Sequence, residues 1–142
     1  MHDVTVRPAD EADAPEIRSL VTRALLSAAL PAPDPDLDAD LVDLAYYATE
    51  GRRVWVAERG GIVVGCAAID RGDPGTAVLR RLAGGALDAL LVEALDFASA
   101  HGGTVVETVL PPGLPGTRDA LERARFQAEP EASALLLRRE LR

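Results

Sequence analysis

Residues 53–70, RVWVAERGGIVVGCAAID, constrain the fold more than any other stretch of this chain. Two runs rich in β-branched and apolar residues flank Arg59-Gly60-Gly61. Because glycine adopts the positive φ angles that a tight hairpin turn requires, this stretch predicts two antiparallel strands joined by a short turn. The only cysteine, Cys66, lies in the second run, where we expect a small buried hydrophobe and no disulfide.

The rest of the amino-terminal half predicts a strand and two helices. VTVR at residues 4–7 alternates as a strand does, and Asp13 with Glu16 forms a capping-box-like start for a helix that runs to about Leu30. After the proline-rich residues 31–40, a short second helix follows. Its apolar side carries Leu41, Val42, Leu44, Ala45 and Ala48.

The carboxy-terminal half continues with a turn at residues 71–75 and a strand at residues 76–82. A helix is predicted at residues 86–101 and ends at Gly102-Gly103. Four of its leucines should lie against the sheet, namely Leu87, Leu90, Leu91 and Leu95. A strand at residues 104–110, a helix at residues 117–125 capped by Thr117, and closing strands at residues 126–129 and 133–141 complete the order β-α-α-β-β-β-α-β-α-β-β.

A single domain at residues 1–142 accommodates this order. The 142-residue chain is long enough for a self-sufficient core and has neither an internal repeat nor a long linker. The predicted fold class is α/β (α+β), with a mixed, twisted sheet of about seven strands and four helices on its faces.

The net charge of −8 narrows the class of partner. An acidic chain lacks the basic clusters that nucleic acids and anionic membrane surfaces attract, and it suits an amine-bearing small molecule. No apolar signal segment or membrane-spanning run is present, so a cytoplasmic protein is expected. His2 and His101 have no partners at ligand spacing, and no metal site is expected.

The element order resembles that of the GCN5-related N-acetyltransferase (GNAT) superfamily over nearly the whole chain. VTVRPADEADAPEIRSLV is similar to the opening strand and helix of that family, and VWVAERGGIVVGCAAI to its second and third strands, with Gly65 at the usual glycine. LRRLAGGALDALLVEALDFASAHGG resembles the fourth strand and central helix, TVVET the fifth strand, and ALERARF the segment before the last hairpin. The resemblance implies a GNAT-like fold and acetyl transfer from acetyl-coenzyme A (acetyl-CoA) to an amine.

The family binds the cofactor pyrophosphate on a longer loop after the fourth strand, patterned Gln/Arg-x-x-Gly-x-Gly/Ala. Here LRRL leads straight into Ala83-Gly84-Gly85, without that pattern. The resemblance assigns cofactor binding to this connection, namely Leu82, Ala83, Gly84, Gly85 and Ala86, with Arg80 and Arg81 before it. The same glycines also suit a tight turn that binds nothing.

Two charges near this connection act in opposite directions. Asp88, in the first turn of the following helix, can accept the free N–H groups itself and opposes an anion there. Neighbouring strand residues point to opposite faces, so one of Arg80 and Arg81 should be placed to offset that charge. The shortened connection, Asp88 and the apolar Leu121 together predict weak binding of acetyl-CoA and slow or no turnover.

Candidate catalytic residues are few. Glu107, in the predicted fifth strand, suits a general base that takes the amine proton, and it equally suits a solvent-facing strand residue. Glu58, at the end of the hairpin's first strand, is a weaker candidate of the same kind. The family often has a tyrosine as general acid where this chain has Leu121. Tyr46 and Tyr47 are expected to pack the second helix against the core.

A run of aspartates between the first two helices borders the acceptor site in the family. Its substrate-binding candidates are Asp34, Asp36 and Asp38, and Asp40 belongs to the same run. These carboxylates suit a cationic amine, and they also suit a solvated loop that caps the next helix. Two function classes therefore remain: an N-acetyltransferase with a shortened cofactor loop, and a non-catalytic ligand-binding module on the same scaffold. A homodimer is compatible with either.

Overall fold

The predicted hairpin lies inside a seven-stranded sheet. A computed structural model of the chain describes residues 3–130 and 136–141. The strands are β1 (Val4–Pro8), β2 (Arg53–Arg59), β3 (Ile62–Arg71), β4 (Thr76–Gly84), β5 (Val105–Val109), β6 (Gln127–Ala128) and β7 (Leu136–Glu140). They are ordered β1-β2-β3-β4-β5-β7-β6, and every neighbouring pair is antiparallel except β4 and β5. The mixed sheet is confirmed.

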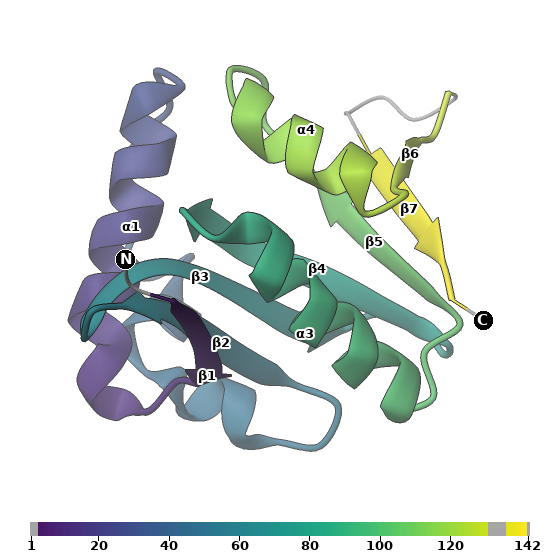
Figure 1. The fold of residues 1–142 in the computed structure, drawn as a ribbon, viewed down its shortest axis with the longest axis horizontal. Helices are drawn as coiled ribbons and strands as arrows, with labels where there is room; N and C mark the ends of the chain where they lie inside the picture. Colours follow the sequence, from purple (N-terminus) through teal and green to yellow (C-terminus); the bar gives the residue numbers. More distant parts are fainter. Residues whose placement is uncertain (1–2, 131–135, 142) are drawn as a thin grey trace.

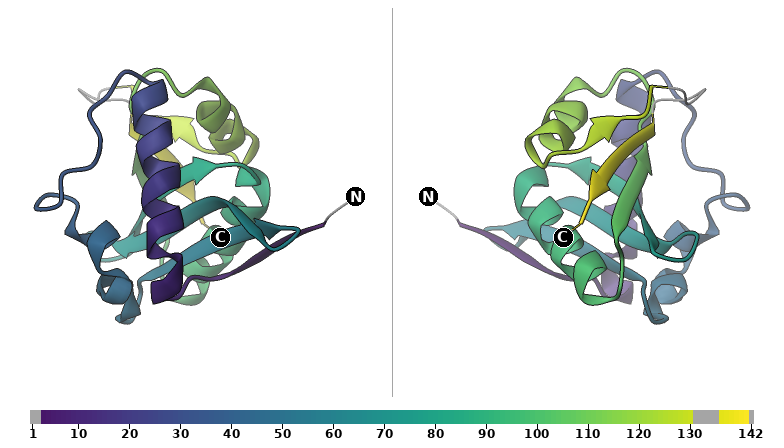
Figure 2. Two further views of the ribbon diagram at one scale, coloured as in Figure 1. Left: turned by 90° about the vertical axis from the view of Figure 1, so that its left-hand side faces the viewer. Right: turned by 90° about the vertical axis from the view of Figure 1, so that its right-hand side faces the viewer.

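Helices cover both faces of this sheet (Figures 1 and 2). They are α1 (Ala14–Ser27), α2 (Ala39–Val42), α3 (Leu87–Ala100) and α4 (Pro115–Arg123), together with the 3-10 segments η1 (Glu11–Asp13) and η2 (Leu44–Ala48). One buried cluster lies under α1 and α2, and the other lies under α3 and α4. The predicted element order and the four helices are confirmed, and none of the helices in the described residues is both long and apolar enough to cross a membrane.

The amino-terminal helices differ from their predicted bounds. The capping box forms one turn early, between Asp10 and Asp13, and caps η1. Helix α1 ends at Ser27 because Ala29 adopts a left-handed φ of 59°, and the following N–H of Leu30 returns to the carbonyl of Leu25. The second helix is split into α2 and η2 by Asp43, whose backbone is extended.

That split changes which side chains are buried. Leu41, Leu44 and Tyr47 are buried, whereas Val42, Ala45 and Ala48 are exposed. The predicted apolar side is therefore confirmed for Leu41 and Leu44 and wrong for the other three residues. Because the chain changes direction at Asp43, helical spacing cannot be continued across it.

The carboxy-terminal elements also shift. Helix α4 begins at Pro115 rather than Thr117, and no side chain caps it. Proline is favoured at this first helical position because its missing N–H would have no partner there. The strand predicted at residues 126–129 is confined to β6, and the first part of the strand predicted at residues 133–141 lies outside the described residues.

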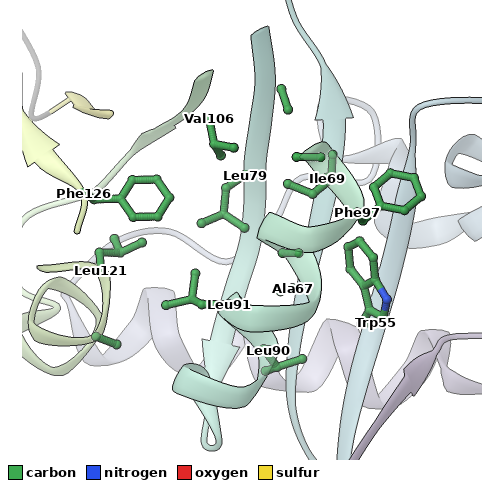
Figure 3. Close-up of a cluster of buried hydrophobic side chains, with 14 of the residues drawn as sticks. Trp55, Ala67, Ile69, Leu79, Leu90, Leu91, Phe97, Val106, Leu121 and Phe126 are labelled. Atoms are coloured by element: carbon green, nitrogen blue, oxygen red, sulfur yellow. The ribbon is translucent and has the colours of Figure 1, made fainter. Parts of the chain in front are cut away.

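The larger core cluster lies between the sheet and helices α3 and α4 (Figure 3). Leu90 and Leu91 are fully buried there, as predicted, and Leu87 and Leu95 are partly buried against the same cluster. The rings of Trp55 and Phe97 meet edge to face, with centroids 5.2 Å apart. Aromatic pairs of this geometry contribute about 0.5–1.5 kcal/mol beyond the area they bury.

Candidate active site between β4 and β5

The two parallel strands of the sheet separate after a short paired stretch. Only Thr76–Val78 of β4 pairs with Val105–Glu107 of β5, and beyond that point the strands diverge toward their carboxyl ends (Figure 1). The Oγ1 of Thr108 donates to the carbonyl of Leu79 at 2.8 Å, which bridges the start of the gap with a side chain. The divergence leaves the facing edges of the two strands without strand partners in the space between them.

A β-bulge in β4 accompanies this divergence. Ala83 pairs with Cys66 and Arg80 with Ala68, so two β4 residues lie opposite one residue of β3. The first of the two, Arg81, has a φ of 59°, so its backbone is in the left-handed region. This conformation costs about 1–2 kcal/mol for a residue other than glycine. Bulges bend a strand and increase its twist, so the second half of β4 turns away from its original course.

The gap holds a cavity of about 340 Å³, and helices from both faces of the sheet contribute to its walls. Its walls are mostly aliphatic. They come from α1 (Val21, Ala24 and Leu25), from β4 (Val78–Ala83), from β5 (Thr108 and Val109), from the following loop (Pro111 and Leu114) and from α4 (Thr117 and Leu121). Such a channel suits a thin, largely apolar chain lying between the two strands.

A second cavity of about 640 Å³ lies beyond the end of β4 and shares Leu114 and Thr117 with the first. The first turn of α3 forms part of its wall, and the helix N-cap, Ala86, is left-handed and gives no side-chain cap. Uncapped N–H groups at a helix start attract negative charge. Asp88 does not cap them, because it pairs with Arg123, whose Nε lies 3.1 Å from its Oδ1.

The connection from β4 to α3 is shorter than the sequence predicts. Strand β4 continues through Ala83 and Gly84, so only Gly85 and Ala86 link it to α3. A Cβ at Gly84 would lie 2.4 Å from the Val64 carbonyl oxygen, and one at Gly65 would lie 2.0 Å from the Gly85 carbonyl oxygen. Close backbone approach therefore explains both glycines, and Gly84 also has a φ of 86°, in the left-handed region that favours glycine.

Arg80 and Arg81 do not point to opposite faces, which overturns the alternation assumed from the sequence. Since the bulge interrupts that alternation, both guanidinium groups turn toward α2 and meet Asp40. Arg81 donates hydrogen bonds to Asp40 from two nitrogens, at 2.7 and 3.0 Å, and to Asp38 at 2.8 Å. Both arginines therefore pair with aspartates of their own chain, on the side of the sheet away from Asp88.

Asp40 lies at the centre of this network and is nearly inaccessible. Burial alone would raise the pKa of its carboxyl, but hydrogen bonds from Arg81 and from the Tyr47 hydroxyl, at 2.6 Å, hold that pKa below the usual value. Burial and the neighbouring carboxylate raise the pKa of Tyr47. The sequence indicated these aspartates only as a charged run. The signal that could identify Asp40 is its position one residue before the buried Leu41.

Asp70 extends the same network. It accepts hydrogen bonds from Tyr46, Arg52 and Arg80, at 2.7, 2.7 and 3.1 Å. Its burial favours the neutral acid, and these donors outweigh that effect, so its pKa is lowered. The hydroxyls of Tyr46 and Tyr47 both donate to carboxylates. Tyr47 packs into the core as expected, but Tyr46 is exposed.

The three aspartates predicted to bind substrate differ in their surroundings. Asp34 accepts from the N–H groups of Asp36 and Leu37, so its carboxylate shapes its own turn. The second oxygen of Asp38 accepts from the N–H of Asp34. Asp36 is exposed. Of the three, only Asp38 contacts the wall of the cavity between β4 and β5, through its ion pair with Arg81.

The two candidate bases, Glu107 and Glu58, lie on different strands and far from each other in the sheet order. Glu107 is the last β5 residue paired with β4, so it marks the point where the strands diverge, and its carboxylate lies 3.2 Å from Arg138 of β7. Glu58 lies on β2, which β3 and β4 separate from the gap, and its carboxylate accepts two hydrogen bonds from Arg7. Leu121 lines the gap as a buried apolar side chain.

Metal binding finds no support within residues 3–130 and 136–141. No group of three or more histidine, cysteine, aspartate or glutamate side chains gathers there in an arrangement that could hold an ion. Burial raises the pKa of Cys66 to about 12, which fits the predicted role of a small buried hydrophobe.

Several solved structures share this architecture, although no protein-family model and no curated protein sequence matches the chain. An acetyltransferase of the GNAT family from Staphylococcus aureus superposes with a TM-score of 0.86 at 12% identity, over 99% of this chain and 100% of the other. A putative acetyltransferase from Salmonella typhimurium, solved with its cofactor acetyl-CoA, gives 0.76 at 22% identity, over 98% and 94%. A phosphinothricin acetyltransferase of the GNAT superfamily from Sinorhizobium meliloti, in complex with acetyl-CoA, gives 0.75 at 18% identity, over 97% and 88%. The chain has the fold of GNAT acetyltransferases, as its element order predicted.

Proposed function

We propose that this protein is an N-acetyltransferase that moves an acetyl group from acetyl-CoA to the amine of a small cationic acceptor. The observation that carries the proposal is the divergence of β4 and β5 around a channel that continues to the uncapped start of α3. Two proteins with the same fold were solved with acetyl-CoA, which favours this cofactor. A cytoplasmic location, where acetyl-CoA is made and used, belongs to the same proposal.

The residues present fit the cofactor in two parts. Its pantetheine arm is thin and carries amide groups, and it suits a mostly aliphatic channel edged by strand backbone without strand partners. Its pyrophosphate suits the second cavity, where Ala86, Leu87 and Asp88 begin α3 and Arg123 supplies a positive charge. When bound there, acetyl-CoA supplies an acetyl group activated as a thioester.

Weak binding is part of the proposal. Only Gly85 and Ala86 join β4 to α3, so few backbone N–H groups are available to surround a pyrophosphate. Arg80 and Arg81 are held by aspartates on the other side. Asp88 adds a negative charge that Arg123 offsets.

Glu107 is the base in this proposal. It lies where the strands part, is partly exposed, and its carboxylate forms an ion pair with Arg138. From there it can take the proton that an attacking amine must lose, directly or through one water. The family's usual general-acid position is Leu121, which has no proton to give, and this absence favours slow turnover.

The acceptor class rests on charge. The chain carries a net charge of −8, and Asp34 and Asp36 lie exposed in the segment between α1 and α2. A cationic amine would be drawn to that segment at low ionic strength. Replacing Asp36 with asparagine should then raise the KM for the amine and leave the affinity for acetyl-CoA unchanged.

A non-catalytic module that has lost cofactor binding is the second candidate. The two-residue connection between β4 and α3 favours it, since a tight turn alone accounts for the backbone there. The cofactor experiment separates the two candidates.

The experiment measures the thermal stability of the protein with acetyl-CoA. We expect stabilisation at millimolar but not micromolar cofactor, because a ligand at 100 times its Kd stabilises the folded state by about 2.7 kcal/mol. Ala24→Phe, which places a ring in the channel, should abolish the effect, whereas Ala100→Phe at the exposed end of α3 should retain it. Glu107→Gln should keep the effect and lower kcat by about 10²-fold or more.

Two results would contradict the proposal. Stabilisation that survives Ala24→Phe would place the cofactor outside the channel. No stabilisation of the unchanged protein at millimolar acetyl-CoA would favour the non-catalytic module.

A further inference from the structure

Arg81 combines three features that the proposed reaction does not use. It has a left-handed backbone inside a strand, it is the first residue of the bulge, and its side chain is largely buried against α2. A left-handed arginine persists in a strand only when surrounding contacts hold it there.

Those contacts come from both ends of the residue. Its guanidinium binds Asp40 through two nitrogens and Asp38 through one, and its carbonyl accepts from the Cys66 thiol at 3.1 Å. Asp40 is in turn held by the Tyr47 hydroxyl. Burial opposes the charge on Arg81, yet these carboxylates raise its pKa, so the guanidinium stays ionised and bound.

The bulge lies beside the channel. Arg80, Arg81 and Leu82 all line it, shortly after the pairing of β4 with β5 ends at Val78. A regular β4 would keep its original course beside β5, and the gap between the strands would narrow.

We propose that Arg81 is a positioning residue: through Asp38 and Asp40 it holds the β4 bulge that keeps the cofactor channel open. The effect of Arg81 on acetyl-CoA binding rests on the proposed function. Its role in holding the bulge rests on the backbone geometry alone. It assigns Asp38 to the cofactor side of the reaction, as part of the fastening of Arg81.

Two substitutions at this position separate backbone from side chain. Arg81→Gly removes the ion pairs but adopts a left-handed φ freely, so the bulge should persist. Arg81→Ala removes the same ion pairs and disfavours that φ, so β4 should relax toward a regular strand. We expect Arg81→Ala to raise the Kd for acetyl-CoA about fivefold to tenfold relative to Arg81→Gly, which corresponds to the cost of a left-handed alanine.

Denaturant unfolding of the same variants gives a readout without cofactor. In a regular strand alanine is more stable than glycine, whereas at a left-handed position the order is reversed. We therefore expect Arg81→Gly to unfold at a higher urea concentration than Arg81→Ala. Asp38→Asn should raise the Kd for acetyl-CoA, as Arg81→Ala does. Its matched control, Asp36→Asn, should leave that Kd unchanged.

Equal Kd values for the glycine and alanine variants would overturn the positioning role, because only the shared loss of ion pairs would then matter. If the unchanged protein binds no acetyl-CoA, the proposed function fails, and the order of unfolding alone decides whether Arg81 holds the bulge. If Arg81→Ala unfolds at a higher urea concentration than Arg81→Gly, the role of Arg81 in holding the bulge is overturned as well.

Discussion

The effect of the Asp88 charge on an anion bound at the start of α3 depends on one neighbour, Arg123. Its carboxylate lies in the first turn of α3, where a negative charge competes with a bound phosphate, but Arg123 lies within ion-pair distance. Both side chains are exposed, so the pair itself adds little stability. Its importance is for the local potential at the helix start.

We therefore predict that Asp88→Asn tightens acetyl-CoA binding, since the substitution leaves the Arg123 charge unopposed. Removal of an exposed charge near a phosphate changes binding by about 1 kcal/mol, or fivefold. Calorimetry at low and high salt measures it, and the gain should shrink as salt screens the charges. Asp96→Asn, on an exposed position of the same helix, is the control. Unchanged or weaker binding in Asp88→Asn would mean that this carboxylate is only a surface partner of Arg123.

Side-chain directions are where sequence reasoning failed at this scale. Alternation placed Arg80 and Arg81 on opposite faces, and one extra residue in β4 brought both to the same face. A bulge with a left-handed arginine has no local signature, because the contacts that hold it come from Asp38 and Asp40, about forty positions earlier. For Glu107 the sequence predicted only the strand, and that strand, β5, is confirmed.

Periodicity predicted the elements well where one face is buried along their whole length. The hairpin formed by β2 and β3, with positive φ at both Gly60 and Gly61, and the buried stripe of α3 are confirmed. Boundaries that depend on tertiary contacts were missed. The end of α1 at a left-handed Ala29 and the break at Asp43 follow no residue preference that the sequence displays.

The junction of β3, β4 and α3 gives a prediction for an element. Gly65→Ala would place a methyl carbon 2.0 Å from the Gly85 carbonyl oxygen, so β3 and the start of α3 must move apart. Overpacking of this kind costs about 1–3 kcal/mol. We expect urea unfolding to show that loss.

The matched control is Gly116→Ala, in the first turn of α4, where an added Cβ meets nothing within 4 Å. Alanine suits a helix better than glycine, so this variant should be as stable as the parent or slightly more so. Equal stability of the two variants would mean that the junction is not tightly packed.

The whole molecule should lose stability in acid. Among the described residues, four carboxyls, those of Asp13, Asp38, Asp40 and Asp70, have a pKa below the usual value of 3.8: burial raises the pKa of each, but hydrogen bonds from arginines and other donors to the charged form lower it more. The unfolded chain therefore binds more protons than the folded one near and below that pH. Stability from these groups is fully present well above pH 4 and falls as the pH drops through their lowered values.

Urea unfolding at several pH values between 7 and 3 tests this expectation. The unfolding free energy should change little down to about pH 5 and then decline, and Asp40→Asn should flatten part of the decline because one of the four groups is gone. A free energy of unfolding that stays constant to pH 3 would contradict the ion pairs described for these carboxyls.

The short pairing of β4 with β5 also has a mechanical consequence. The described contacts along this seam between the half-sheets β1–β4 and β5–β7 are three residue pairs, the Thr108 hydroxyl, and bonds from Thr104 and Val105 to the Gly75 carbonyl at its start. Segments with few shared hydrogen bonds open locally at lower free energy than the rest of a domain. An occupant of the seam with its own amide groups would act as an additional strand and would bind the two half-sheets into one continuous unit where they now share few hydrogen bonds.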